Sequence, residues 1–314
     1  MPKLSVIMCT YNRGHYLSRS VESVLSQTLD DFEFVLVNNG STDDSLDICK
    51  YYAEKDSRIK LIDIIENKGA SSGRNAGLLA ASCNYITIVD DDDVCYPEML
   101  QFLWDLSQKY NADISMCGSW NQIEDQLEPY FIFDELLVLD KVQSLDALLQ
   151  RQKYNVAPPT KLFHKKLFKD ILFKENVLVD DIHVIYKVFA NANLVVAQGK
   201  PLYSFTKHSG NMTNFIQTNI IPPALLSEYH SAFRERTEYL SKRVPEIAPR
   251  ARYAEMSFMI SMCGKIPRTS EYVDLYNVMV EKLRESYDEL ICSPYLTEKE
   301  ELILENILSS SYTE

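Results

Sequence analysis

Residues 85–93 read Tyr-Ile-Thr-Ile-Val-Asp-Asp-Asp-Asp, an apolar run that ends in four consecutive aspartates. A short apolar run bounded by polar residues predicts a buried strand. Pro97 follows shortly afterwards and suits the first turn of a helix, which we expect over residues 98–110. The chain is therefore expected to leave a buried strand through an acidic loop and then to enter a helix.

The same order of strand, polar loop and helix recurs on both sides of this stretch. Apolar runs of strand length cover residues 4–9, 32–37, 59–65 and 114–118. Apolar residues at helical spacing follow the first three of these runs, at 16–27, 46–52 and 76–80. Alternating strands and helices joined by short loops predict an α/β fold with a doubly wound, mostly parallel sheet.

Polar residues gather at 10–13, 38–43 and 90–93, each at the carboxyl end of an expected strand. In doubly wound sheets, ligands bind beyond the carboxyl ends of the strands. We therefore expect these separate loops to line one crevice.

Beyond residue 120 the alternation loosens. Strand-like runs at 129–133 and 194–205 accompany helical spacing at 142–152 and 181–192. The last third reads as amphipathic helices, at 222–242, 247–264, 270–288 and 297–309. The expected organisation is a domain over 1–214, with halves at 1–120 and 121–214, and a helical subdomain over 215–314.

Composition narrows the function classes. Hydrophobic residues make up 46% of the chain and charged residues 25%, so a globular core is expected. The formal net charge of -13 argues against nucleic-acid partners and against a basic face that docks on a membrane. The cysteines are scattered without a Cys-x-x-Cys pair, which is typical of free thiols in a reducing compartment. With neither a secretory signal nor a transmembrane run, a cytoplasmic protein is expected.

The aspartate run is a candidate metal site. Adjacent carboxylates repel one another unless a cation compensates their charge, and carboxylate oxygens suit Mg²⁺ or Mn²⁺. The alternative is a solvated acidic turn or a helix cap, and Asp93 in particular fits a cap. A position directly after a buried strand favours the metal. A second acidic pair, Asp180-Asp181, opens an expected helix, where the alternative role is again a cap.

Four stretches in order resemble the motifs of inverting family-2 glycosyltransferases with the GT-A fold. They are Ser-Val-Ile-Met-Cys-Thr-Tyr-Asn-Arg (5–13), Val-Asn-Asn-Gly-Ser-Thr-Asp (37–43), Asn-Lys-Gly-Ala-Ser-Ser-Gly-Arg-Asn-Ala-Gly (67–77) and Val-Asp-Asp-Asp-Asp (89–93). The resemblance covers residues 3–120 strongly and continues more weakly to about 213. It implies a GT-A sheet with a C-terminal helical subdomain.

On the metal side, the resemblance implies that Asp90 and Asp92 form the DxD motif, with Asp92 as the direct ligand of Mn²⁺ or Mg²⁺. Asp91 is then expected to face the ribose or the donor sugar. Lys207 and His208 resemble a loop that closes over the diphosphate, where His208 completes the metal shell and Lys207 offsets charge. The alternative for this pair is a solvated turn.

On the nucleotide side, Thr10 and Tyr11 match positions that flank the base, and Asn12, Arg13 and Lys68 are expected in the same site. Asn39 stands where relatives usually carry an aspartate that accepts a hydrogen bond from uracil. An asparagine can accept this bond or present a donor instead, so uridine is favoured and other bases stay open.

Arg74 matches the arginine of an Arg-Asn pair and is expected to contact the base or a phosphate. The alternative is a structural role opposite the strand-end carboxylates. In relatives the second acidic pair reads Glu-Asp, which implies that Asp181 is the general base and Asp180 supports it. Inversion needs such a base, placed across the sugar from the leaving group.

The resulting hypothesis is transfer of a sugar, with inversion, from a nucleotide-diphosphate sugar, favouring a UDP-sugar. The acceptor is expected to be a glycan or a lipid-linked or protein-linked hydroxyl in bacterial cell-surface glycan or glycoprotein synthesis. Peripheral membrane association through partners, and oligomerisation, remain open. One alternative is a catalytically silent nucleotide-sugar-binding partner subunit, for which the departures at Asn39 and Asp180 leave room. Another, a Mg²⁺-dependent phosphoryl or nucleotidyl transferase, expects a glycine-rich phosphate loop, which does not appear.

Overall fold

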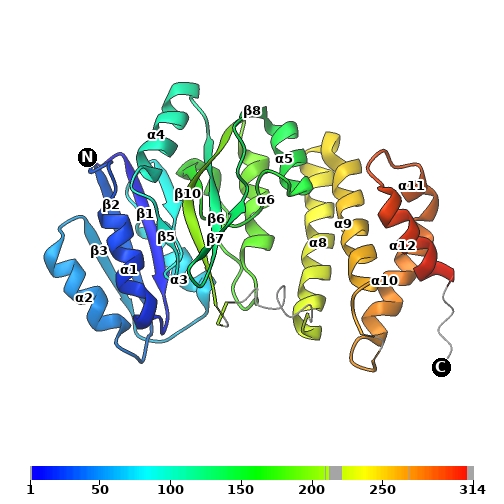
Figure 1. Ribbon diagram of the computed structural model, residues 1–314, viewed down its shortest axis with the longest axis horizontal. Coiled ribbons are helices and arrows are strands. Elements are labelled where there is room, and N and C mark those ends of the chain that lie inside the picture. Colours follow the sequence, from blue (N-terminus) through cyan, green and yellow to red (C-terminus); the bar gives the residue numbers. More distant parts are fainter. Residues whose placement is uncertain (1, 209, 212–220, 268, 310–314) are drawn as a thin grey trace. The chain divides into compact units, whose positions relative to one another are not determined.

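Parallel strands in the order β3-β2-β1-β4 form the first half of the central sheet. The computed structural model describes residues 2–208, 210–211, 221–267 and 269–309 (Figure 1). It confirms the strands expected from the apolar runs, namely β1 (Leu4–Thr10), β2 (Phe32–Asn39), β3 (Ile59–Ile64) and β4 (Tyr85–Ile88). The helices between them are α1 (Gly14–Leu25), α2 (Ser45–Lys55) and α3 (Ala70–Ala80).

The second half of the sheet is mixed. Strand β9 (Lys161–His164) lies antiparallel between β4 and β6 (Ile114–Ile123). Next to β6 runs β10 (Leu194–Lys207), parallel to it. The remaining strands pair antiparallel, with β5 (Val94–Cys95) and β8 (Leu136–Asp140) on β10 and β7 (Gln126–Tyr130) on β6. The helices here are α4 (Met99–Tyr110), α5 (Lys141–Gln150) and α6 (Asp181–Asn191), and Lys165–Phe168 form a 3-10 turn.

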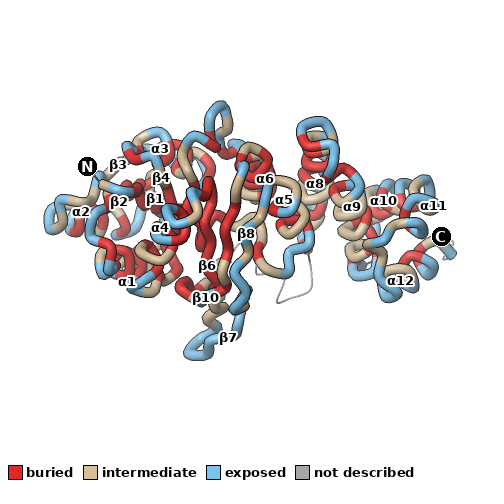
Figure 2. The backbone as a smooth tube through the Cα atoms, turned by 90° about the horizontal axis from the view of Figure 1, so that it is seen from above, coloured by how far each residue is buried: buried red, intermediate tan, exposed pale blue. Residues whose placement is uncertain are grey.

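The hydrophobic core around the sheet surrounds its central strands. Leu4, Val6, Ile7 and Met8 of β1 are fully buried. A strand that is buried on both faces reads as a continuous apolar run, as β1 does. Figure 2 shows the same burial along β6 and β10, whereas β7 is exposed.

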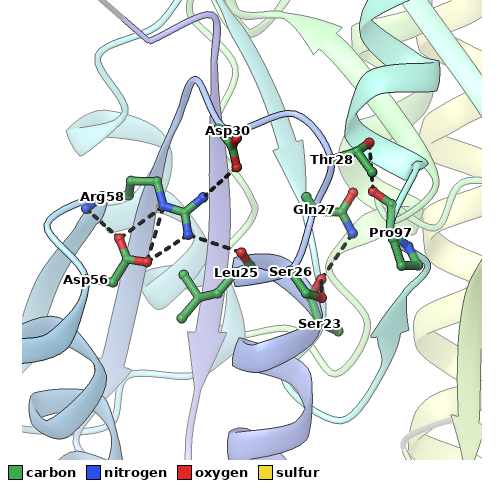
Figure 3. Close-up of polar contacts among 9 residues, drawn as sticks. All are labelled: Ser23, Leu25, Ser26, Gln27, Thr28, Asp30, Asp56, Arg58 and Pro97. Atoms are coloured by element: carbon green, nitrogen blue, oxygen red, sulfur yellow. Dashed lines mark hydrogen bonds and ion pairs between the residues drawn. The ribbon is translucent and has the colours of Figure 1, made fainter.

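Polar contacts at the amino ends of the strands fix the turns opposite the expected crevice (Figure 3). The Arg58 guanidinium donates to Asp56 and, at 3.1 Å, to the carbonyl oxygen of Leu25. This arginine therefore joins the end of α1 to the loop before β3. On the other side of α1, the Thr28 hydroxyl donates to the Pro97 carbonyl oxygen at 3.2 Å.

The chain divides into two compact units, Met1–Ser209 and Gly210–Glu314. The expected boundary between residues 214 and 215 lies outside the described residues. The C-terminal unit consists of α8 (Pro223–Arg243), the 3-10 turn Pro245–Ile247, α9 (Ala248–Cys263), α10 (Val273–Glu285), α11 (Tyr287–Ile291) and α12 (Glu298–Ser309). Helix α9 packs against α8, α10 and α12. Over the described ranges, no helix is both long and apolar enough to cross a membrane.

Candidate active site

The four aspartates lie at the carboxyl end of β4 but have different surroundings. Asp93 is buried, and its carboxylate accepts hydrogen bonds from the Tyr203 hydroxyl and the Thr206 backbone N–H, both at 2.7 Å. Burial raises the pKa of Asp93 well above its ordinary value, with Asp92 adding to the rise. Because α4 begins only at Met99, with Glu98 at its N-cap, Asp93 does not fill the alternative role of helix cap. Its side chain instead anchors β10 beside the acidic loop.

Asp92 lies against the end of β10. The Nε2 atom of His208 is 3.0 Å from Asp92 Oδ2, and the His208 ring stacks on Tyr16 of α1 with centroids 4.6 Å apart. Arg19, also on α1, donates from one guanidinium nitrogen to the Asp92 carbonyl oxygen and the Thr206 hydroxyl, each at 2.8 Å. Helix α1 therefore holds His208 at the aspartate run. Sequence reasoning missed Tyr16, Arg19 and Tyr203, because their contacts join distant segments and leave no local pattern.

The Asp92–His208 pair suits a metal ion shared with a phosphate ligand. Within the described part of the chain, no three His, Cys, Asp or Glu side chains are grouped so that they could hold an ion by themselves. Mg²⁺ and Mn²⁺ are commonly held by one or two protein ligands, with water and phosphate oxygens completing the shell. A carboxylate oxygen and an imidazole nitrogen within 3.0 Å of each other fit this arrangement.

Arg74 connects the aspartate run to the second acidic pair. Its guanidinium lies 2.9 Å from Asp90 Oδ1 and also forms an ion pair with Asp180. Burial opposes the charge, but Asp180 and Asp90 raise the pKa of Arg74 well above its ordinary value. Of the two roles considered for Arg74, this geometry matches pairing with the carboxylates.

Asp181 begins α6, and its environment differs from that of a simple helix cap. The preceding residue, Asp180, is the N-cap but makes no side-chain capping bond. Asp181 Oδ1 and Asp180 Oδ2 are buried and have no hydrogen-bond partner among the residues with described positions. Burial raises the pKa of Asp181 to about 6, Asp180 adds to the rise and Arg74 opposes it. A carboxylate with this pKa and an unused oxygen is suited to accept a proton near neutral pH.

The loop after β1 is tied to the loop after β2. Asn12 Oδ1 accepts the Thr42 N–H at 2.8 Å, and the Asn12 N–H donates to the Ser41 hydroxyl at 3.1 Å. These bonds occupy the side-chain oxygen and the backbone N–H of Asn12. Tyr11, beside it, is 42% exposed, so its ring is available to a planar ligand.

Asp91 is buried. Burial raises the pKa of Asp91 to about 7, with Asp92 adding to the rise, while the charge of Arg13 opposes it. Arg13 therefore lies within electrostatic range of the acidic run.

Asn39 ends β2 with its amide orientation fixed by the chain. Its Nδ2 donates to the Gly69 carbonyl oxygen at 2.8 Å and to Asn67 Oδ1 at 3.1 Å. Asn67 Oδ1 also accepts the Gly69 N–H at 2.8 Å. A backbone N–H can only donate and a carbonyl can only accept, so neither amide can be reversed. Asn39 Oδ1 therefore faces away from Gly69 and, within the described ranges, has no partner.

The two lysines of the expected site differ in placement. Lys207 is half-buried at the end of β10, and burial lowers its pKa while Asp93, Asp92 and Asp90 oppose this shift. Lys207 therefore lies within electrostatic range of the aspartate run. Lys68 is exposed beside Gly69.

Comparison with known proteins identifies the family. The model of glycosyl transferase family 2 matches residues 5–172. The glycosyltransferase GlyG of Streptococcus pneumoniae is 30% identical over 217 residues, which cover 67% of this chain and 72% of GlyG. Its glycosyltransferase GlyA is 32% identical over 219 residues, covering 67% of this chain but only 31% of GlyA.

Among solved structures, residues 1–349 of S. aureus TarS in complex with UDP-GlcNAc superpose with a TM-score of 0.73 at 21% identity. This match covers 96% of this chain and 84% of the TarS chain, and it shows that the two share the GT-A fold with a helical C-terminal region. The family match spans more than half of the chain, and the alignment with GlyG spans more than two thirds of that relative. The chain is thus a glycosyltransferase and belongs to family 2.

Proposed function

We propose that the protein transfers a sugar from a UDP-sugar to an acceptor hydroxyl, with inversion at the anomeric carbon and with Asp181 as the general base. The observation that carries this proposal is the pairing of Asp180, next to Asp181, with the Arg74 guanidinium that also binds Asp90. A carboxylate suited to accept a proton is thereby linked to the run that we assign to the diphosphate.

Recognition of uridine is supported by the orientation of Asn39. Its amide nitrogen is occupied by Gly69 and Asn67, so the position presents an acceptor only. Uracil carries an N3–H donor on its pairing edge, whereas cytosine carries an acceptor at the same position. An unpaired buried acceptor is costly, and an incoming N–H removes that cost. The uridine diphosphate sugar bound by TarS agrees with this assignment.

We assign the metal position to Asp92, with Asp90 and His208 beside it, and the ion to Mn²⁺ or Mg²⁺. When bound, such an ion stabilises the negative charge of the leaving diphosphate. Lys207 contributes further positive charge near the same carboxylates. Asp91, between the metal ligands, is left to contact the ribose or the donor sugar.

Asp181 performs the second half of the chemistry. Its carboxylate takes the proton of the acceptor hydroxyl as the hydroxyl oxygen bonds to the anomeric carbon. The bond from that carbon to the diphosphate oxygen breaks in the same step, and UDP leaves with the bonding electron pair. Among the described residues the buried Oδ1 of Asp181 has no hydrogen-bond partner, and together with the raised pKa this favours a general base over the catalytically silent alternative.

A donor and acceptor panel tests this function. The protein is incubated with Mn²⁺, a glycan acceptor and UDP-glucose, UDP-galactose, UDP-GlcNAc or UDP-GalNAc, and UDP release and the anomeric configuration of the product are measured. We expect acceptor-dependent UDP release from one of these donors and a β-linked product from the α-linked donor. A product with retained configuration, or UDP-sugar binding without turnover on any acceptor class, would overturn the proposal.

A further inference from the structure

The segment that carries the second acidic pair has no helix or strand of its own. Residues 171–180 run from the 3-10 turn to α6 without regular secondary structure. A segment of this kind lacks ladder hydrogen bonds, so its position must come from side chains that bind its backbone. Helix α3 supplies them.

Asn75 of α3 binds both backbone groups of Phe173. Its Nδ2 donates to the Phe173 carbonyl oxygen at 2.9 Å, and its Oδ1 accepts the Phe173 N–H at 2.8 Å. Both residues are buried, so each bond satisfies a group that water does not reach. The side-chain amide thus takes the place of a neighbouring strand.

Two neighbours on the same helix face bind the segment further along the chain, at Lys174 and Asp180. The Ser71 hydroxyl donates to the Lys174 carbonyl oxygen at 2.6 Å, and Arg74 forms the ion pair with Asp180. Positions 71, 74 and 75 are spaced i, i+3 and i+4, so they share one side of α3. Helix α3 therefore binds the segment at residues 173 and 174 and at Asp180, the residue before Asp181.

Helix α3 is itself seated tightly on the sheet. A Cβ atom at Gly73 would collide with Cys9 Sγ, and one at Gly77 with Ile7 Cγ2. The absence of side chains at these glycines lets α3 approach β1 closely. The sheet therefore fixes α3, and α3 in turn fixes the segment relative to Asp90.

We propose that Asn75 is a positioning residue for the glycosyl transfer, which it serves by fixing the backbone that leads to Asp181. This inference rests on the proposed role of Asp181 as base. The hydrogen bonds of the Asn75 side chain go to Phe173, and among the described residues none goes to the aspartate run or to Asp181. Its loss is therefore expected to reduce turnover without weakening nucleotide binding.

The test separates turnover from binding in the full chain. For Asn75→Ala we expect kcat to fall by about a hundredfold, because a small displacement of a catalytic group is costly. The Kd of UDP with Mn²⁺ should stay within about twofold, since the nucleotide contacts are intact. Turnover is measured with the best donor of the panel and UDP binding by calorimetry. Ser71→Ala removes one hydrogen bond to the segment, that to Lys174. It should lower kcat less than Asn75→Ala does and leave the Kd of UDP unchanged, so it provides the test if Asn75→Ala does not fold.

Asn191→Ala is the matched control. The Asn191 amide also donates to a backbone carbonyl, that of Leu167 at 3.0 Å, but it does so at the far end of α6. Equal losses of kcat in the Asn191 and Asn75 variants, or a parallel loss of UDP affinity in Asn75→Ala, would overturn the inference. Asp181→Asn distinguishes this failure from that of the proposed function. If Asp181→Asn still turns over, the base assignment fails; if it is inactive while Asn75→Ala is fully active, only the positioning role fails.

Discussion

Arg74 of α3 forms a partly buried ion pair with Asp180, a residue 106 positions later in the chain. The same guanidinium lies 2.9 Å from Asp90. One side chain thus connects the carboxylates that we assign to the donor diphosphate with those that we assign to the acceptor proton.

Replacing Arg74 with methionine should destabilise the fold as well as the reaction. Asp90 and Asp180 would lose the guanidinium that compensates their charges. Removing one partner of a fully buried ion pair costs about 3 kcal/mol of unfolding free energy, and this partly exposed pair should lose about 2 kcal/mol. Urea denaturation at pH 7 measures this change. Arg74→Lys keeps the charge but not the fork that reaches both carboxylates, so it should recover part of the loss. Equal denaturation midpoints for wild type and Arg74→Met would contradict the arrangement.

Introducing at position 39 the aspartate that the family resemblance implies should harm this protein. In Asn39→Asp, a carboxylate would face the Gly69 carbonyl oxygen and Asn67 Oδ1, which are both acceptors. We expect UDP affinity to fall by about tenfold. The carboxylate cannot donate to Gly69 and Asn67, so these residues no longer fix the side-chain oxygen that accepts from the base. Calorimetry with UDP measures this fall. Asn191→Asp, in which the amide also donates to a carbonyl, should leave UDP affinity unchanged. Tighter UDP binding by Asn39→Asp would refute the orientation argument.

Turnover should depend on pH through Asp181. The base must be ionised, and burial raises its pKa to about 6, so kcat should fall to half near pH 6 and continue falling below it. An acidic limb centred near pH 4 would contradict the assignment.

The same pKa shift predicts a stability effect. The folded-state pKa of Asp181 lies above the unfolded value of about 3.9. The folded state therefore binds more protons than the unfolded state between about pH 4 and pH 6. The contribution of Asp181 to the unfolding free energy decreases as pH rises through that window. Asp181→Asn removes this penalty, so the variant should be more stable than wild type at pH 7 and equally stable near pH 4. Thermal unfolding at both pH values tests the sign, and a variant less stable than wild type at pH 7 would contradict it.

The stack between Tyr16 and His208 should influence metal binding. Tyr16→Leu removes the ring that holds the imidazole beside Asp92, and we expect Mn²⁺ affinity in the presence of UDP to fall by about tenfold. Tyr16→Phe keeps the ring and should bind Mn²⁺ as wild type does. Paramagnetic resonance of free Mn²⁺ provides the measurement. The same affinity for the Leu and Phe variants would show that the stack does not support His208.

The parallel half of the sheet, β1 to β4 with the helices between them, could be predicted from the sequence. The apolar runs at β1 to β4 are long enough to identify, and their helices show clear periodicity, so the parallel strands were expected. Strand β9 was not expected, because a run from Lys161 to His164 is too short to distinguish from a loop. Its antiparallel insertion changes the second half of the sheet from parallel to mixed.

For the site, the sequence located the acidic groups but not the contacts between them. That Asp90 and Asp180 share Arg74 depends on how α3 docks, and no spacing encodes this. The orientation of the Asn39 amide likewise depends on the backbone of Gly69. By sequence position Asp93 fits a helix cap, whereas its actual partners, on β10, lie more than a hundred residues away.

The most direct test of the central claim is the transfer rate of Asp181→Asn compared with its donor affinity. Asparagine preserves the shape of the side chain but cannot accept the proton. We predict that transfer from the UDP-sugar falls by roughly a thousandfold, while calorimetry shows the donor binding with a Kd close to that of wild type. Transfer at the wild-type rate by Asp181→Asn would contradict the account.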